Sequence, residues 1–161
     1  MAQLESDEAI AKIPHLTTRH LIVVMIETGL RGGDAYTLPF NPVLTDSSGW
    51  PCLRFEAVKV RAERLIPLSA KAAAAIAAQQ DHVRQRWPAG SPWLFPGTAG
   101  NQDGSTPYSH SAFSQQLRRW QRAIGLRDEA GQPVTVTGHQ FRHTLVICTA
   151  SDPVRDVSSA A

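Results

Sequence analysis

The feature that most constrains the fold is an unbroken apolar run over residues 21–26, between Thr17 and Thr18 on one side and Gly29 on the other. Threonine can cap the start of a helix and glycine suits its end, so we predict a helix from about residue 17 to Gly29. A helix that is apolar on all sides must lie inside the protein. The chain of 161 residues, 42% of them hydrophobic, is long enough to build one compact domain around it.

Two strands and a further helix are predicted next along the chain. Residues 52–58 and 63–68 have the composition of short strands, and the basic turn between them predicts an antiparallel hairpin. Ser69 can then cap an alanine-rich helix over residues 70–87, which ends before a proline.

A later helix is predicted from its apolar stripe. It begins at Ser109 or Ser111 and ends at Gly125, and one face carries Phe113, Leu117, Trp120 and Ile124. Weaker signals predict a loosely held stretch at 1–16, a helical turn at 33–38, a loop at 41–51, and a final helix from Thr137 through Leu145. The fold class expected from these elements is α+β, mainly helical, with a small antiparallel hairpin or sheet.

The net charge of +2 hides an uneven distribution. Residues 51–142 carry twelve basic and six acidic side chains, whereas residues 1–50 carry three basic and six acidic ones. The basic segment is a candidate surface for a polyanion. On charge alone, we prefer the interpretation of an ordinary domain with arginines on its solvated faces.

Export and membrane insertion are both disfavoured. No apolar run approaches the length of about 18 residues that a membrane span requires. The first residues are acidic, where a secretory signal would be basic and then apolar. The two cysteines, Cys52 and Cys148, are too few for a disulfide framework and fit a reducing compartment. We therefore expect a cytoplasmic protein with no membrane partner.

Three short segments carry side chains suited to a phosphodiester. The segment TGLR places Arg31 at the exit of the buried helix, with Asp34 close behind as a carboxylate that could orient it. Lys59 lies in the turn of the hairpin. The segment GHQFRHT places His139 and Arg142 on one face of the last predicted helix. Taken singly, each could be an ordinary surface residue.

Together these groups could act on a phosphate without a metal. Guanidinium groups pair with two phosphate oxygens at once, and lysine or histidine can give a proton to a leaving oxygen. His139 and His143 have a spacing that could hold zinc, but Cys148 is the one further ligand with suitable spacing. We predict no metal and no cofactor.

The three segments resemble the motifs of the tyrosine recombinases, the phage integrase family. TGLR with Asp34 resembles the family's first-arginine motif, AVKVRAERLIPL its β-hairpin lysine motif, and GHQFRHT its His-x-x-Arg box. They occur in the family's order. The resemblance covers residues 17–147 as an integrase-like catalytic core, with a short segment at 1–16 and a tail at 148–161 that does not match.

The resemblance implies a role for each matching residue. Arg31 and Arg142 would bind the scissile phosphate, Lys59 would protonate the leaving 5′ oxygen, and His139 would assist proton transfer. Asp34 and His143 would support them. Double-stranded DNA is the implied partner, with other recombinase protomers as a further one. Candidate contacts to the DNA backbone are Arg61, Arg64, Arg118 and Arg119, although the last two could simply flank a buried Trp120 in solvent.

The sequence departs from the family after Arg142. The family has a second His or Trp there and then the tyrosine nucleophile, but residues 147–161 contain no Tyr, Trp or His. The two tyrosines lie elsewhere: we predict packing for Tyr36, and either packing or DNA contact for Tyr108. We therefore expect a truncated core of a recombinase-type enzyme that cannot cleave DNA alone.

Three functions remain open from the sequence. The chain could be a DNA-binding fragment of a recombinase or integrase catalytic domain, used in DNA recombination and DNA integration. It could be a non-catalytic DNA-binding or regulatory module. It could also be a non-functional remnant whose exposed apolar surface favours aggregation.

Overall fold

The computed structural model describes residues 6–137 apart from residues 58, 60 and 129. Its centre is the helix α3 (Leu16–Thr28), whose apolar run from Leu21 to Met25 is buried on every side. Gly29 ends α3 in the left-handed conformation with φ of 66°, and its N–H donates to the carbonyl of Met25 at 2.9 Å. The prediction of a core helix ending at Gly29 is confirmed, but the predicted cap at Thr17 or Thr18 is wrong, because the N-cap is His15 and both threonines are buried within the helix.

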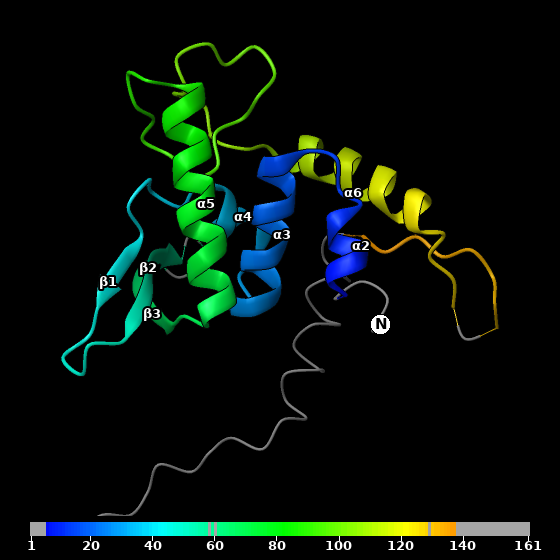
Figure 1. Cartoon of the computed structure of the whole chain (residues 1–161), viewed down its shortest axis with the longest axis horizontal. Coiled ribbons are helices and arrows are strands. Elements are labelled where there is room, and N and C mark those ends of the chain that lie inside the picture. The colour runs from blue at the N-terminus through cyan, green and yellow to red at the C-terminus, as the bar shows by residue number, and fades with distance from the viewer. Residues whose placement is uncertain (1–5, 58, 60, 129, 138–161) are drawn as a thin grey trace, which may run out of the picture.

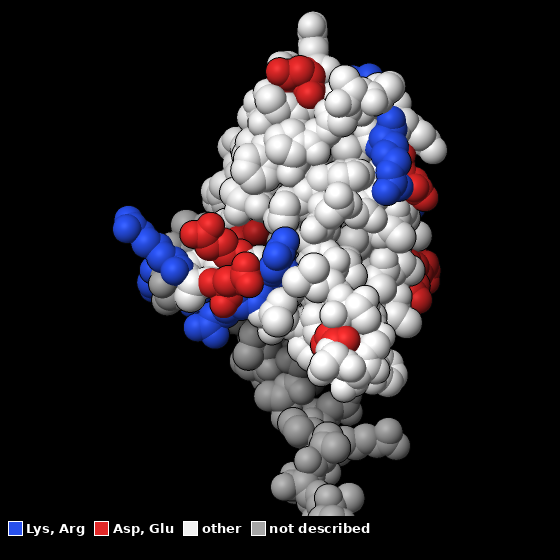
Figure 2. Space-filling model, turned by 90° about the vertical axis from the view of Figure 1, so that its left-hand side faces the viewer, with Lys and Arg blue, Asp and Glu red and all other residues white. Residues whose placement is uncertain are grey.

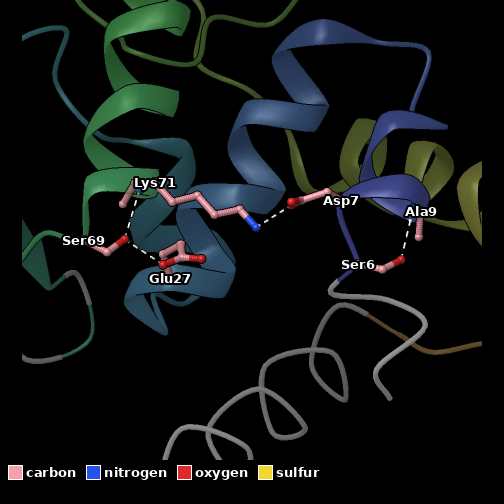
Figure 3. Close-up of polar contacts among 7 residues, drawn as sticks. Ser6, Asp7, Ala9, Glu27, Ser69 and Lys71 are labelled. Atoms are coloured by element: carbon pink, nitrogen blue, oxygen red, sulfur yellow. Dashed lines mark hydrogen bonds and ion pairs between the residues drawn. The ribbon is translucent and has the colours of Figure 1, made fainter.

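Two other helices flank α3 in Figure 1. The alanine-rich α5 (Ala70–Arg86) packs along one side, and the short α2 (Asp7–Ala11) lies on the other. The Ser69 hydroxyl accepts from Ala72 N at 3.1 Å and so caps α5 as the sequence predicts. The same hydroxyl donates to Glu27 Oε2 at 2.6 Å, which joins the start of α5 to the end of α3 (Figure 3).

The expectation that residues 1–16 are loosely held is wrong for the stretch from α2 to Ile13. Ile10 and Ile13 are buried in the core, and the Trp120 indole N–H donates to Ala9 O at 2.6 Å. Lys71 Nζ also lies 2.7 Å from Asp7 Oδ1 (Figure 3). Five residues give too little helical periodicity to detect, and this helix depends on contacts with distant parts of the chain.

The sheet has three antiparallel strands in the order β1-β2-β3. Strands β2 (Pro51–Ala57) and β3 (Ala62–Pro67) form the predicted hairpin. Strand β1 (Val43–Thr45) corrects the prediction of a loop over 41–51. All three of its residues are exposed, so no apolar alternation marks it. Its pairing with β2 is favoured by a turn in which Asp46 Oδ1 accepts from Trp50 N at 2.8 Å.

The remaining helices complete the predicted α+β fold. The short α4 (Gly32–Tyr36) follows α3 at once, where the sequence predicts a helical turn. The helix α6 (His110–Ile124) is capped by Ser109 and ended by Gly125. Its predicted stripe is confirmed, because Phe113, Leu117 and Trp120 are buried.

The predicted final helix lies largely outside the described residues, since the description stops at Thr137. The division at 1–16, 17–147 and 148–161 stays a prediction. Within the part of the chain that is described, no helix has both the length and the apolar character to span a bilayer.

Candidate functional site

A cleft of about 320 Å³ opens between the end of α3 and the β2–β3 hairpin. The α3 side contributes residues 29–31 and Asp34 of α4, and the hairpin side contributes residues of both strands. Its lining consists of Gly29, Leu30, Arg31, Asp34, Phe55, Ala57, Arg64 and Ile66. The cleft therefore combines an apolar floor with two arginines and one carboxyl group.

Arg31 is held at the mouth of this cleft by the way α3 ends. Thr28 Oγ1 donates to Val24 O at 2.6 Å and accepts from Leu30 N at 3.4 Å, while Gly29 turns the chain. Leu30 is buried at 3% exposure and anchors the turn in the core, whereas Arg31 is exposed. A rigid helix end thus presents a guanidinium group to the cleft.

Asp34 lies in the first turn of α4 and is 7% exposed. It lines the same cleft as Arg31, and the expectation that it supports Arg31 stays a prediction. The backbone between them is tightly packed, because a Cβ added at Gly32 would lie 2.7 Å from the Tyr36 hydroxyl oxygen. A side chain at position 32 would displace either the Tyr36 ring or the chain that carries Arg31.

Arg64 faces the cleft because of the strand alternation. In the antiparallel register Phe55 lies opposite Arg64, and both residues line the cleft. Arg54 lies opposite Leu65 on the other face of the sheet, where Leu65 is 58% exposed. The period of two therefore directs one arginine of the hairpin inward and another outward.

Lys59 and Arg61 occupy the turn of the hairpin and are exposed. Arg61 has a positive φ of 48°, which is uncommon for a residue with a side chain. Neither Lys59 nor Arg61 is among the described residues that line the cleft. The sequence indicates Arg64 only as a candidate contact to the DNA backbone, and the structure puts it on the cleft wall beside Phe55.

Figure 2 looks onto the sheet side and shows basic and acidic side chains crowded at one corner of a largely uncharged face. The exposed charged residues of the hairpin are of both signs: Arg54, Glu56, Lys59, Arg61, Glu63 and Arg64. The positive charge of the middle segment is therefore not a uniform basic patch here. The positions of the charged side chains around the cleft are therefore more informative about a binding site than the net charge of the segment.

Arg118 and Arg119 lie far from this cleft in the sequence and on the exposed face of α6. Trp120 beside them is fully buried, as predicted. Arg118 lines a different hollow of about 240 Å³, with residues such as His110 and Val136. Both arginines lie on the outer face of α6, and their contact with DNA stays a prediction.

His139, Arg142 and His143 lie outside the described residues. The convergence of Arg31, Lys59, His139 and Arg142 on one point therefore stays a prediction. Among the residues that are described, no group of three His, Cys, Asp or Glu side chains is placed to hold a metal ion.

Both tyrosines are buried. Tyr36 is 6% exposed and packs against Phe113 with ring centroids 5.6 Å apart. Tyr108 is 4% exposed, and its hydroxyl lies 2.6 Å from Thr18 Oγ1. Burial raises the pKa of both phenols above the ordinary value of 10.0. The packing role predicted for Tyr36 is confirmed, and Tyr108 also packs within the fold.

Comparison with known proteins agrees with this fold. The sequence model of the phage integrase family matches residues 3–149. Transposase B from transposon Tn554 of Staphylococcus aureus is 28% identical over 134 residues, which are 83% of this chain and 20% of that protein. Transposase B from transposon PsiTn554 of Staphylococcus aureus is 27% identical over 143 residues, which are 89% of this chain and 22% of that protein.

The solved structures show the same architecture. The XerH site-specific recombinase bound to its difH substrate before cleavage superposes with a TM-score of 0.66 at 22% identity, over 88% of this chain and 39% of that one. The post-cleavage complex of XerH gives a TM-score of 0.65 at 23% identity, over 90% of this chain and 40% of that one. The chain thus spans about a fifth of the curated relatives and two fifths of XerH. Because the family's model matches nearly the whole sequence, this chain belongs to the phage integrase family of tyrosine recombinases.

Proposed function

We propose that this chain binds double-stranded DNA and holds a backbone phosphate in the cleft at Arg31. The observation that carries the proposal is the cleft itself, where exposed Arg31 from the end of α3 faces a hairpin wall that also carries an arginine. Guanidinium groups are suited to phosphate oxygens because they pair with two of them at once. The complexes of the related XerH with its difH substrate support DNA as the ligand.

The roles of the other residues follow the family. Arg142 would share the phosphate with Arg31, His139 would assist proton transfer, and Lys59 would protonate the leaving 5′ oxygen. The exposed position of Lys59 in the hairpin turn is compatible with a residue that reaches toward bound DNA. Other recombinase protomers are a further proposed partner, and we propose a cytoplasmic location, to which the buried free thiol of Cys52 is suited.

We also propose that neither Tyr36 nor Tyr108 acts as the nucleophile. A phenol must reach the phosphorus atom and lose its proton, and both hydroxyls are enclosed by the fold. Binding without cleavage is therefore the activity that this chain supports by itself. The test is a DNA substrate with a nick that traps covalent intermediates. We expect no covalent protein–DNA product, and an adduct formed by the wild-type chain would overturn this part of the proposal.

The binding itself is tested by measuring the affinity for a DNA duplex over a series of salt concentrations. If phosphate contacts dominate, the logarithm of the binding constant should fall linearly with the logarithm of salt, by about 0.9 for each contacted phosphate. Arg31→Ala should weaken binding in the same series. A wild-type chain that fails to bind DNA at low salt would contradict the proposal and favour a non-functional remnant.

A further inference from the structure

We propose that Arg64 grips the same DNA phosphate as Arg31, so that arginines on opposite walls of the cleft hold one phosphodiester group. This inference rests on the proposed function and assigns a second phosphate-binding residue to it. Lys59, at the turn of the same hairpin, then has a separate position from which to act.

The register of the hairpin fixes the direction of Arg64. Phe55 and Arg64 are partners across β2 and β3, and Ala57 and Ile66 lie on the same face as they do. All four line the cleft. Because neighbouring side chains in a strand point to opposite faces, a slip of the strand by one residue would move Arg64 to the other face, and that slip would also expose the buried Phe55.

The backbone that carries Arg31 on the opposite wall is also well ordered. Gly29 in its left-handed conformation and the buried Leu30 fix the chain immediately before it. The space between the walls is small, at about 320 Å³. Two exposed arginines, each carried by an ordered stretch of backbone, therefore border one cleft.

The charge of the cleft favours an anion. Arg31 and Arg64 bring two positive charges, and Asp34 is the one acidic residue among the described residues that line the space. Like charges that share a small space repel each other, and a bound anion relieves that repulsion. A phosphodiester has one negative charge and two non-bridging oxygens, so each guanidinium can donate to it.

The floor of the cleft strengthens such contacts. Leu30, Phe55 and Ala57 are buried apolar residues, at 3%, 7% and 5% exposure. Apolar atoms close to a bound phosphate lower the local dielectric constant, and a charge-assisted hydrogen bond is then stronger than it is in bulk water. The ligand expected here is therefore a DNA phosphate that lies against this apolar floor and is held by two arginines.

The experiment measures binding of the full chain to a fluorescent duplex with one central nick, over salt concentrations from about 50 to 200 mM. We expect Arg64→Ala to weaken binding roughly tenfold or more and to lower the salt slope by about 1. Arg64→Lys keeps the charge but loses the planar fork, and an intermediate affinity is expected. Thermal unfolding of each variant checks that the fold is intact.

The matched control is Arg54→Ala. It removes the same charge from the same hairpin, but from the outer face opposite Leu65. An outward charge acts on bound DNA only through its screened field, so we expect a change of at most a few-fold. Equal effects of Arg54→Ala and Arg64→Ala would overturn the inference.

A double-mutant cycle tests whether the phosphate is shared. If Arg31 and Arg64 hold one phosphate, Arg31→Ala and Arg64→Ala together should cost less than the product of the two single losses. A loss equal to that product means separate phosphates and overturns the inference alone, since DNA binding through Arg31 would still stand. Failure of the wild-type chain to bind would overturn both proposals.

Discussion

The β2–β3 hairpin and α6 are both rich in arginine, but they use it differently. On α6 the arginines lie on the exposed face of a helix whose other face is buried at Phe113, Leu117 and Trp120. In the hairpin, Arg64 is turned toward the core side and lines a cleft with Arg31. Arginine therefore forms the solvated face of a helix in α6, whereas in the hairpin it lines a candidate binding cleft.

This difference shows that local charge does not locate a binding site. The arginines of α6 follow from a helical period, which puts polar residues opposite the apolar stripe. Arg64 of the hairpin lies on the face that carries the buried Phe55, although its own side chain is exposed. Two arginines that line one cleft, one from each wall, make the cleft the stronger candidate.

The largest expected effect is on stability and comes from the buried face of α6. Trp120→Ala should lower the free energy of unfolding by about 3–5 kcal/mol, because a large core side chain and its hydrogen bond to Ala9 O are lost. Arg119→Ala on the exposed face should change it by less than about 0.5 kcal/mol. Chemical denaturation measures both. Similar losses would mean that the two faces of α6 are not divided as described.

The second effect is on DNA binding and compares the two regions directly. Arg31→Ala should weaken binding by about tenfold or more, because one of the two guanidinium groups that line the cleft is lost. Arg119→Ala removes one exposed charge from α6 and should have a clearly smaller effect. Fluorescence polarisation at fixed salt gives both values. A larger loss for Arg119→Ala would move the candidate interface to α6.

The third effect tests the packing of Tyr36, which connects α4, beside the cleft, to α6. Gly32→Ala should destabilise the protein by about 1–3 kcal/mol, because the new Cβ would lie 2.7 Å from the Tyr36 hydroxyl oxygen, and the Tyr36 ring is packed against Phe113 of α6. Gly33→Ala is the matched control. A Cβ there meets nothing within 4 Å, so the helical preference of alanine should stabilise α4 slightly. Equal destabilisation in both variants would rule out the Tyr36 contact as the cause.

The smallest effect is a pH dependence that belongs to neither region. Burial lowers the pKa of His15, His20 and His82 below 6.5. The nearby charge of His82 also lowers the pKa of His15 and His20. The unfolded chain then binds more protons than the folded one, so stability is full above about pH 6.5 and falls as the pH drops below it. Chemical denaturation should give a lower free energy of unfolding at pH 5.5 than at pH 7.5. This difference should be smaller in His20→Gln. None of these three histidines lines the cleft, so a parallel loss in DNA affinity of the folded protein would contradict this separation.

Several elements could be predicted from the sequence because their signals are local. The apolar run of α3, the cap of α5 at Ser69 and the stripe of α6 all depend on spacing along the chain. The motif around Arg31 was found in the same way. The strand β1 and the helix α2 were missed, because β1 is exposed on the sheet and α2 is held by contacts such as that between Ala9 O and Trp120.

The sequence by itself determined α3, α5, α6 and the β2–β3 hairpin, and which residues match the family's motifs, because periodicity, capping and order along the chain are local properties. Only the tertiary structure decided that Arg31 and Arg64 line one cleft while Arg54 points away from it. The reason is that a cleft needs two walls from distant parts of the chain, and the strand register and the packing of α3 set which side chains face each other.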